Sequence, residues 1–255
     1  MGTPIEHVYK FRLKLSDLAA LSRSEKAALT ILCFIVSELN SLKRLSLFAM
    51  DTQELPEDVI PSMAVQRNLI LRTITAKLFE FLRVVEKKVD ATAVDDRVKK
   101  VFQRFSKELD EARTGIGFTI AKKIRNKMAN HFDFEEAEKV VAQCAETVDC
   151  NFYLTEASGN SYYPMGDEII FASGILKAIR DSKLDISFQD ALDEWIDWTL
   201  RLSKLADIMH GAIFEELVLP LVPDRMAHHR PIWLPEDLVA EHPGFRLPIF
   251  IRVEK

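Results

Sequence analysis

Apolar residues recur every three to four positions along most of the chain, a spacing that favours amphipathic helices. The first such segment runs from about Ser24 to Ala49, with Ser24 as the expected N-cap and Glu25 in the first turn. The same pattern predicts further helices over residues 63–89, 94–112, 118–131, 133–148, 166–180 and 187–217. Long helices joined by short connections indicate an all-α fold built as a helical bundle.

Three segments depart from helical spacing. Residues 51–62 contain two prolines and are expected to form a loop. Two short β-prone runs flank residues 157–160, which predicts a small β-hairpin over Asn151 to Tyr163. Residues 220–255 hold six of the ten prolines and are expected to form an extended arm. The expected organisation is a helical bundle over residues 1–149, the hairpin with a helical extension over 150–219, and the proline-rich arm over 220–255.

The composition, 48% hydrophobic and 29% charged, is that of a globular protein, and only 8 glycines leave little room for tight turns. The three cysteines show no CxxC spacing, which is typical of reduced thiols in a reducing compartment. The longest apolar run, Ala27 to Val36, is too short to span a bilayer. We therefore expect a cytoplasmic protein that does not enter a membrane.

The charge distribution isolates one region of an otherwise acidic chain of net charge −5. The interval from Arg113 to Phe132 contains no acidic residue and five basic ones: Arg113, Lys122, Lys123, Arg125 and Lys127. A solvated helix face is the plain interpretation of such a run. The interval also ends beside His131, and Asn126 and Asn130 lie one helical turn apart on one face. These additions make the segment the best candidate for a functional site.

The side chains in this segment suit phosphate chemistry. Arginine offers a permanently charged planar fork to phosphate oxygens, and histidine moves a proton near neutral pH. Together they suit attack of an RNA 2′-hydroxyl on the adjacent phosphodiester, with no metal or other cofactor required. In an ideal helix Arg125 and His131 are about 120° apart and roughly 9 Å along the axis. They converge only through the reach of the arginine, a break near Asn130, or a second copy of the chain.

The sequence "IRNKMANHF" at the end of a helix resembles the signature of HEPN domains, over a region from about Ser24 to Val148. In that signature an arginine with a polar neighbour precedes a histidine, and here these are Arg125, Asn126 and His131. The resemblance implies a metal-independent endoribonuclease of toxin–antitoxin, abortive-infection or CRISPR-linked defence systems. It also implies a homodimer with a composite site, and an antitoxin protein as a further partner. The residues expected to bind RNA are Lys122, Lys123, Lys127 and Asn130.

Two other classes of function compete with this hypothesis. One is a non-catalytic helical module of the same fold that binds a nucleotide, RNA or a partner protein. The other is a structural oligomer in which the basic helix pairs with an acidic surface of another copy.

Other candidate residues carry weaker signals. Arg67-Asn68 begins like the same motif, but no histidine follows in range, so exposed helix surface is expected. A metal site at His228-His229 has no nearby ligands in the sequence, and His210 is expected to be a structural partner or surface group. Residues expected to serve packing rather than chemistry are Trp195 and Trp198, together with Cys144 and Cys150, which lack a nearby histidine. Gly115-Ile116-Gly117 lacks the further glycine of a dinucleotide loop.

Overall fold

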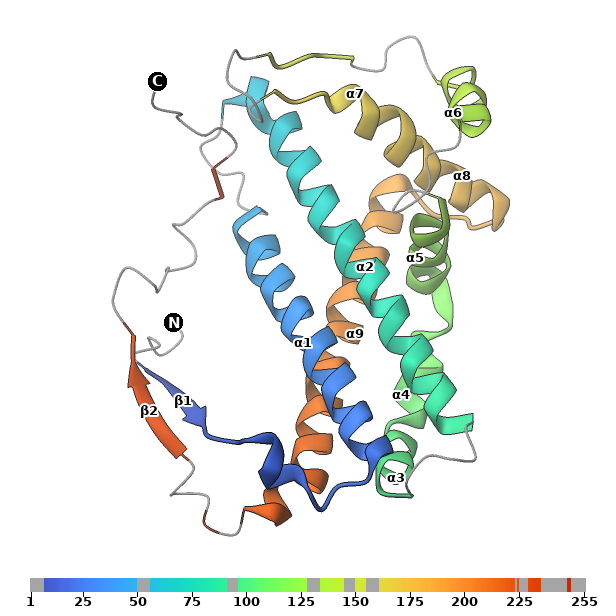
Figure 1. The fold of residues 1–255 in the computed structure, drawn as a ribbon. Helices are drawn as coiled ribbons and strands as arrows, with labels where there is room; N and C mark the ends of the chain where they lie inside the picture. The colour runs from blue at the N-terminus through green and yellow to red at the C-terminus, as the bar shows by residue number, and fades with distance from the viewer. Residues whose placement is uncertain are drawn as a thin grey trace.

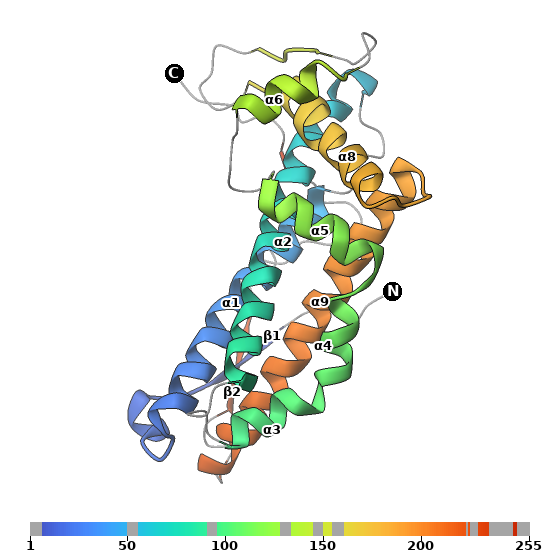
Figure 2. The same cartoon turned by 90° about the vertical axis from the view of Figure 1, so that its right-hand side faces the viewer.

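Three long helices, α1, α2 and α9, pack side by side and form the body of the molecule (Figures 1 and 2). Helices α3 and α4 lie along α9, α5 crosses between α2 and α9, and α6 to α8 gather at one end (Figure 2). The computed structural model describes residues 7–49, 56–90, 96–127, 134–144, 150–154, 161–222, 224, 229–234 and 247–248. Its elements are β1 (His7–Phe11), η1 (Leu15–Leu18), α1 (Arg23–Ala49), η2 (Glu57–Val59), α2 (Ile60–Asp90), α3 (Asp96–Arg104), α4 (Ser106–Ala112), α5 (Gly115–Lys127), α6 (Phe134–Val141), α7 (Pro164–Gly166), the π-helix η3 (Asp167–Ala172), α8 (Ser173–Asp181), α9 (Phe188–Leu217), η4 (Leu219–Leu221) and β2 (His229–Trp233).

Helix α1 begins one residue earlier than predicted because a different serine caps it. The Ser22 hydroxyl accepts a hydrogen bond from the Glu25 amide at 3.1 Å, and the Glu25 carboxylate accepts one from the Ser22 amide at 2.8 Å. This reciprocal pair is a capping box, which satisfies two amides that the helix itself leaves unbonded. Ser24, the predicted N-cap, therefore lies inside the first turn.

Helix α2 also begins earlier than predicted. The loop expected over residues 51–62 gives way to η2 and then to α2 at Ile60, so Pro61 lies in the first helical turn. Proline is tolerated there because its missing amide would have had no partner within the helix. The apolar periodicity of residues 63–89 includes Leu69 together with Leu78 and Phe81, but Leu69 is 57% exposed, whereas Leu78 and Phe81 are fully buried.

The helix predicted over residues 94–112 is two helices, α3 and α4. They are separated at Phe105, where φ is −108° and ψ is 14°, outside the helical region. Phe105 is partly buried against the core, and Phe102 and Leu109 on either side are buried. The bend thus lets apolar residues on both sides of it reach the same core.

Glycines begin helix α5 rather than precede it. Gly115 has a positive φ of 84°, which an L side chain rarely adopts, and α5 starts there, three residues earlier than predicted. Helix α6 spans Phe134–Val141 and is shorter than the predicted 133–148. The end of the predicted fourth helix and Asp133, at the start of the predicted fifth, lie outside the described residues.

Strand pairing occurs between two segments for which no strand is predicted. β1 pairs antiparallel with β2, His7 opposite Trp233 and Phe11 opposite His229, so the proline-rich segment supplies a strand to a segment near residue 10. The predicted hairpin is represented by a single antiparallel bridge between Tyr153 and Tyr162, with hydrogen bonds of 2.9 and 2.8 Å. The expected turn, residues 157–160, lies outside the described residues.

The regular helix predicted over 166–180 is interrupted by the π-helix η3 between α7 and α8. Helix α9 matches its prediction closely, because Ser187 and Asp190 form the capping box that starts it.

The two tryptophans of α9 lie in the core, as predicted. Trp195 is fully buried and donates a hydrogen bond from Nε1 to the Thr75 hydroxyl at 2.9 Å. Trp198 donates from Nε1 to the carbonyl of Ala112 at 2.7 Å. One continuous cluster of buried apolar residues joins α1, α2, α3, α5, α8 and α9. Both indole N–H groups are thus satisfied inside that cluster, as burial requires.

The all-α prediction is confirmed for the described residues, in which helices dominate and the only sheet has two strands. The resemblance to HEPN domains and the boundaries of the three predicted segments stay predictions. Among the described residues, no helix is both long and apolar enough to cross a membrane.

Helix α5 approaches α9 most closely at Gly117. A Cβ atom built on this glycine would lie 2.4 Å from the carbonyl oxygen of Glu194 and 2.7 Å from Cβ of Trp198. Both atoms belong to α9, so the backbones of the two helices touch here with no space for a side chain. This contact fixes where α5 lies and which of its faces is turned outward.

We expect Gly117→Ala to destabilise the protein by about 1–3 kcal/mol, because the added methyl group overpacks the α5–α9 contact. Gly211→Ala on α9 is the matched control, since a Cβ there would meet nothing within 4 Å. The control should be neutral or stabilising by about 0.5–1 kcal/mol through reduced entropy of the unfolded chain. Urea unfolding of both variants measures these free energies, and equal midpoints for the two would refute the close contact.

Candidate functional site

Helix α5 separates a buried face from a basic outer face. Ile120, Ala121 and Ile124 are fully buried against the core. Lys122 and Asn126 are exposed, and Lys123 and Arg125 are partly exposed. The helical spacing that buries the first set turns the second set outward. The basic run predicted from the sequence therefore lies on accessible surface.

Arg125 is held by contacts from two helices. Its Nη1 donates a hydrogen bond to Oδ1 of the adjacent Asn126 at 2.9 Å. Its Nη2 lies 3.9 Å from Oε1 of Glu80 on α2, and the two side chains are 43% and 40% exposed. An ion pair that long and that solvated contributes about 0–1 kcal/mol. Arg125 is thus oriented by neighbours but not sequestered, and a phosphate would compete with Glu80 for it.

Glu80 also binds a second guanidinium. Arg83, one turn further along α2, forms an ion pair with the same carboxylate and is 55% exposed. Two arginines therefore share one acid where α2 and α5 adjoin, which leaves one positive charge uncompensated by that acid. The sequence did not reveal this, because the acid and its second arginine lie about 40 residues before the basic run.

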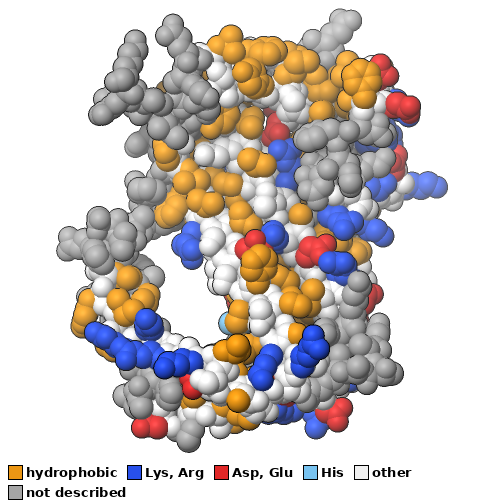
Figure 3. Space-filling view, viewed as in Figure 1, with side chains coloured by type: hydrophobic (Ala, Val, Ile, Leu, Met, Phe, Trp, Pro, Cys, Tyr) orange, Lys and Arg blue, Asp and Glu red, His pale blue; other side chains and the backbone are white. Residues whose placement is uncertain are grey.

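The lysines of α5 differ in their surroundings. Lys123 lies 3.7 Å from Asp181 at the end of α8, with both side chains about 40% exposed. Lys122, the residue before it, is exposed. Figure 3 shows basic and acidic side chains interspersed on the face it presents, rather than one continuous positive surface. Any attraction for RNA along α5 is therefore local, as the acidic net charge requires.

Part of the predicted site lies outside the described residues. Lys127 ends α5, and its side chain is not described. Asn130 and His131 fall in the segment 128–133, which is also outside. The structure thus brings Arg125, Asn126 and Glu80 together, and the distance from Arg125 to His131 stays a prediction.

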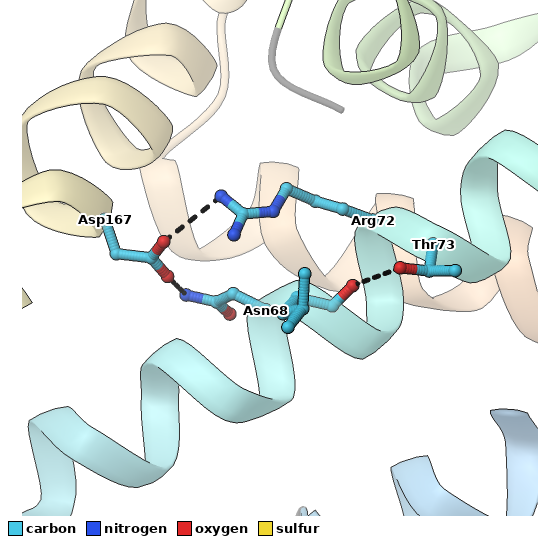
Figure 4. A network of polar contacts seen from close by, with 5 residues as sticks. Asn68, Arg72, Thr73 and Asp167 are labelled. Atoms are coloured by element: carbon cyan, nitrogen blue, oxygen red, sulfur yellow. Dashed lines mark hydrogen bonds and ion pairs between the residues drawn. The ribbon is translucent and has the colours of Figure 1, made fainter. Parts of the chain in front are cut away.

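A second polar cluster joins α2 to η3 (Figure 4). Asp167 accepts a hydrogen bond from Nδ2 of Asn68 at 2.8 Å and one from Nη1 of Arg72 at 3.1 Å. Arg72 and Asp167 are only 16% and 13% exposed, and the guanidinium of Arg72 also lies over the Phe171 ring, 5.2 Å from its centroid. A charged pair in such a setting needs these added contacts to offset its desolvation.

This cluster corrects the interpretation of Arg67-Asn68 as exposed helix surface. Both residues are partly buried, and Asn68 is a direct partner of Asp167. Burial lowers the pKa of Arg67, and the nearby Asp167 carboxylate opposes that shift. The spacing of Asn68 and Arg72 shows that they share one face of α2, but their acidic partner about 100 residues away leaves no signal in the sequence.

The cysteines and histidines singled out in the sequence do not form a metal site among the described residues. Sγ of Cys144 lies 3.5 Å from the Ser173 hydroxyl, and none of the three cysteines forms a disulfide. His229 belongs to β2, whereas His228 lies outside the described residues. Within the described part of the chain, no three His, Cys, Asp or Glu side chains are placed to hold a metal ion. His210, expected to be a structural or surface residue, has a thiol as its neighbour.

Comparison with protein-family models, with curated proteins and with solved structures gave no match to this chain. The residues of α5 and its neighbours are therefore the basis on which function is proposed.

Proposed function

We propose that the chain is a metal-independent endoribonuclease that cleaves RNA by transesterification. Arg125, Asn126 and His131 would be its chemical residues, and RNA would be held by Lys122, Lys123, Lys127 and Asn130. The observation that carries the proposal is the accessible Arg125 guanidinium, oriented by Asn126 and loosely paired with Glu80. Together with its polar neighbour Asn126 and with His131 after five intervening residues, Arg125 forms the motif that resembles HEPN domains.

Each residue has a defined task in the reaction. His131 accepts the proton of the 2′-hydroxyl as the O2′–P bond forms, and the P–O5′ bond breaks as the imidazolium so formed returns the proton to the 5′ oxygen. Arg125 stabilises the charge that develops on the phosphate oxygens, which is a fixed electrostatic contribution. Asn126 holds the guanidinium in place. The products are a 2′,3′-cyclic phosphate and a 5′-hydroxyl. The role as toxin or defence effector follows from the resemblance alone.

A cleavage assay on a mixed RNA pool with EDTA present tests the chemistry. His131→Ala should lower the rate by roughly 10²- to 10⁴-fold, the usual contribution of a positioned acid or base. Arg125→Lys should fail to restore activity, because an ammonium lacks the planar fork. Lys107→Ala, at an 85% exposed site on α4, is the matched control and should leave the rate unchanged.

Transesterification is recognised by its products, a 2′,3′-cyclic phosphate and a 5′-hydroxyl, and by its need for the 2′-hydroxyl. RNA with a 2′-deoxy nucleotide at the scissile position should resist cleavage, because the nucleophile is missing. Binding of RNA without any cleavage would instead identify the non-catalytic module. Cleavage that persists after loss of both Arg125 and His131 would place the active site elsewhere.

RNA affinity should respond to Glu80. Glu80→Gln removes the acid that Arg83 and Arg125 share, so two guanidinium groups become available to phosphates. We expect RNA binding to tighten about two- to fivefold at low salt, which corresponds to roughly 0.5–1 kcal/mol. Its salt dependence should also steepen.

Glu38→Gln is the control for this measurement, because Glu38 pairs with Lys77 rather than with a residue of α5. Fluorescence anisotropy with a labelled RNA at several salt concentrations compares the two variants. Equal effects of both substitutions would show that only the net charge matters and that RNA does not bind at Arg125.

We further propose that the active form is a homodimer with its two-fold axis near α5. The six-residue spacing of Arg125 and His131 keeps them off a common helix face, whereas two facing copies surround one phosphate. Light scattering at tens of micromolar should give a mass twice that of a single chain, which is 29.2 kDa. A strict monomer that cleaves RNA at full rate would contradict the composite site.

A further inference from the structure

A thiol and an imidazole meet where α1 packs against α9. Sγ of Cys33 lies 3.3 Å from Nε2 of His210, although the two residues are 177 positions apart. Cys33 is exposed to solvent, and His210 is partly buried. The bundle itself therefore creates this pair. A thiol within hydrogen-bond reach of an imidazole is the arrangement that activates nucleophilic sulfur in proteins.

A carboxylate stands beside the imidazole. Asp207 precedes His210 by three residues on α9, so the two side chains share one helix face. One oxygen of Asp207, Oδ2, is paired with Lys43 of α1. The other, Oδ1, is buried and has no hydrogen-bond partner among the described residues. A negative charge in this position favours the protonated imidazolium. The thiol therefore contacts the imidazole directly, whereas Asp207 acts on the imidazole through its charge.

The surface next to this group is open. Gly211 adjoins His210, and a Cβ built on it would meet no atom within 4 Å outside its own helix turn. Phe214, one turn further along α9, packs edge-on against Phe11 of β1 with ring centroids 5.5 Å apart. Figure 3 shows an opening between the helical body and the strand pair to which that phenylalanine belongs. Cys33 is itself exposed, so a small molecule can reach its sulfur from solvent.

The protonation states suit a base that acts during the reaction. Burial raises the pKa of the Cys33 thiol, and burial lowers the pKa of His210 against the opposing charge of Asp207. At neutral pH the thiol therefore keeps its proton and donates it to a neutral imidazole. Among the described residues, the charge that acts on His210 is that of Asp207 on α9, which is itself paired with Lys43 of α1. The sulfur becomes a nucleophile only as its proton moves to Nε2.

We propose that Cys33 is a modification site that undergoes thiol–disulfide exchange with low-molecular-weight disulfides, with His210 as the general base and Asp207 stabilising its imidazolium form. The Cys33 sulfur attacks one sulfur of the disulfide while Nε2 takes the thiol proton. A new S–S bond forms at Cys33, the S–S bond of the reagent breaks, and the departing thiolate takes the proton from the imidazolium. The product is a mixed disulfide at the α1–α9 contact. This reaction is independent of the proposed RNA cleavage.

The other two cysteines supply the comparison. One protein with Cys144→Ser and Cys150→Ser retains only Cys33, and another with Cys33→Ser and Cys144→Ser retains only the exposed Cys150. Each is treated with oxidised glutathione, and the mixed disulfide is followed by intact mass. We expect Cys33 to react at pH 7 about tenfold or more faster than Cys150. A Cys33 rate equal to or below that of Cys150 would overturn the proposal.

Substitution of His210 shows whether Cys33 reacts fast because a base activates it or only because it is exposed. His210→Gln should slow the reaction of Cys33 roughly 10- to 100-fold, at or below the usual contribution of a positioned base, and should leave the reaction of Cys150 unchanged. Asp207→Asn should have a smaller effect in the same direction. A Cys33 rate that His210→Gln does not change would exclude a base and overturn the proposal.

The pH dependence of the reaction rate of the Cys33-only protein also tests whether His210 acts as a base, and it does so without a substitution at His210. The rate should rise as pH increases through the pKa of His210, which lies below its ordinary value of about 6.5, and then level off near neutral pH. A thiol without a base would instead react about tenfold faster per pH unit until its own raised pKa. That second profile would overturn the proposal even if His210→Gln failed to fold.

Discussion

The contact of α5 with α9 at Gly117 governs how the candidate site is presented. Because the α5 backbone touches Glu194 and Trp198, α5 cannot rotate about its axis or move outward without losing that contact. Its apolar residues then fill the space beside the buried indoles, and Arg125 is turned toward Glu80 of α2. A glycine, which contributes no chemistry of its own, therefore determines which side chains of the basic run face solvent.

The sequence predicted the elements whose signals are local. A long apolar stripe predicted α9, and the Ser187–Asp190 capping box that the structure shows at its start is likewise a feature that arises within a few residues. The break at Phe105 and the start of α2 at Ile60 were missed, since each depends on which residues the assembled core accepts. The basic face of α5 was predictable for the same reason as α9, whereas its acidic neighbours Glu80 and Asp181 were not.

Long-range partners change what a residue type means. In the sequence, Asn68 and Arg72 are ordinary polar positions of a helix. In the structure, Asp167 binds both of them in a nearly buried cluster. In the sequence, Cys33 is one residue of an apolar run. In the structure, the packing of α1 on α9 brings His210 beside it. In each case the sequence shows one half of a pair and the bundle supplies the other. Chemistry assigned to single residues of a helical protein therefore needs the helix packing before it can be interpreted.

The pairing of β1 with β2 has a consequence for synthesis of the chain. Residues 7–11 leave the ribosome well before their hydrogen-bonding partners at residues 229–233, which are made more than 200 residues later. Contacts separated this widely along the chain form slowly, because a long loop must close first. Until residues 229–233 have been made, the first strand therefore has no strand beside it while the helices fold. Val8 lacks its cross-strand neighbour Ile232 for all of that time, which makes this segment a natural place for a chaperone to act on the nascent protein.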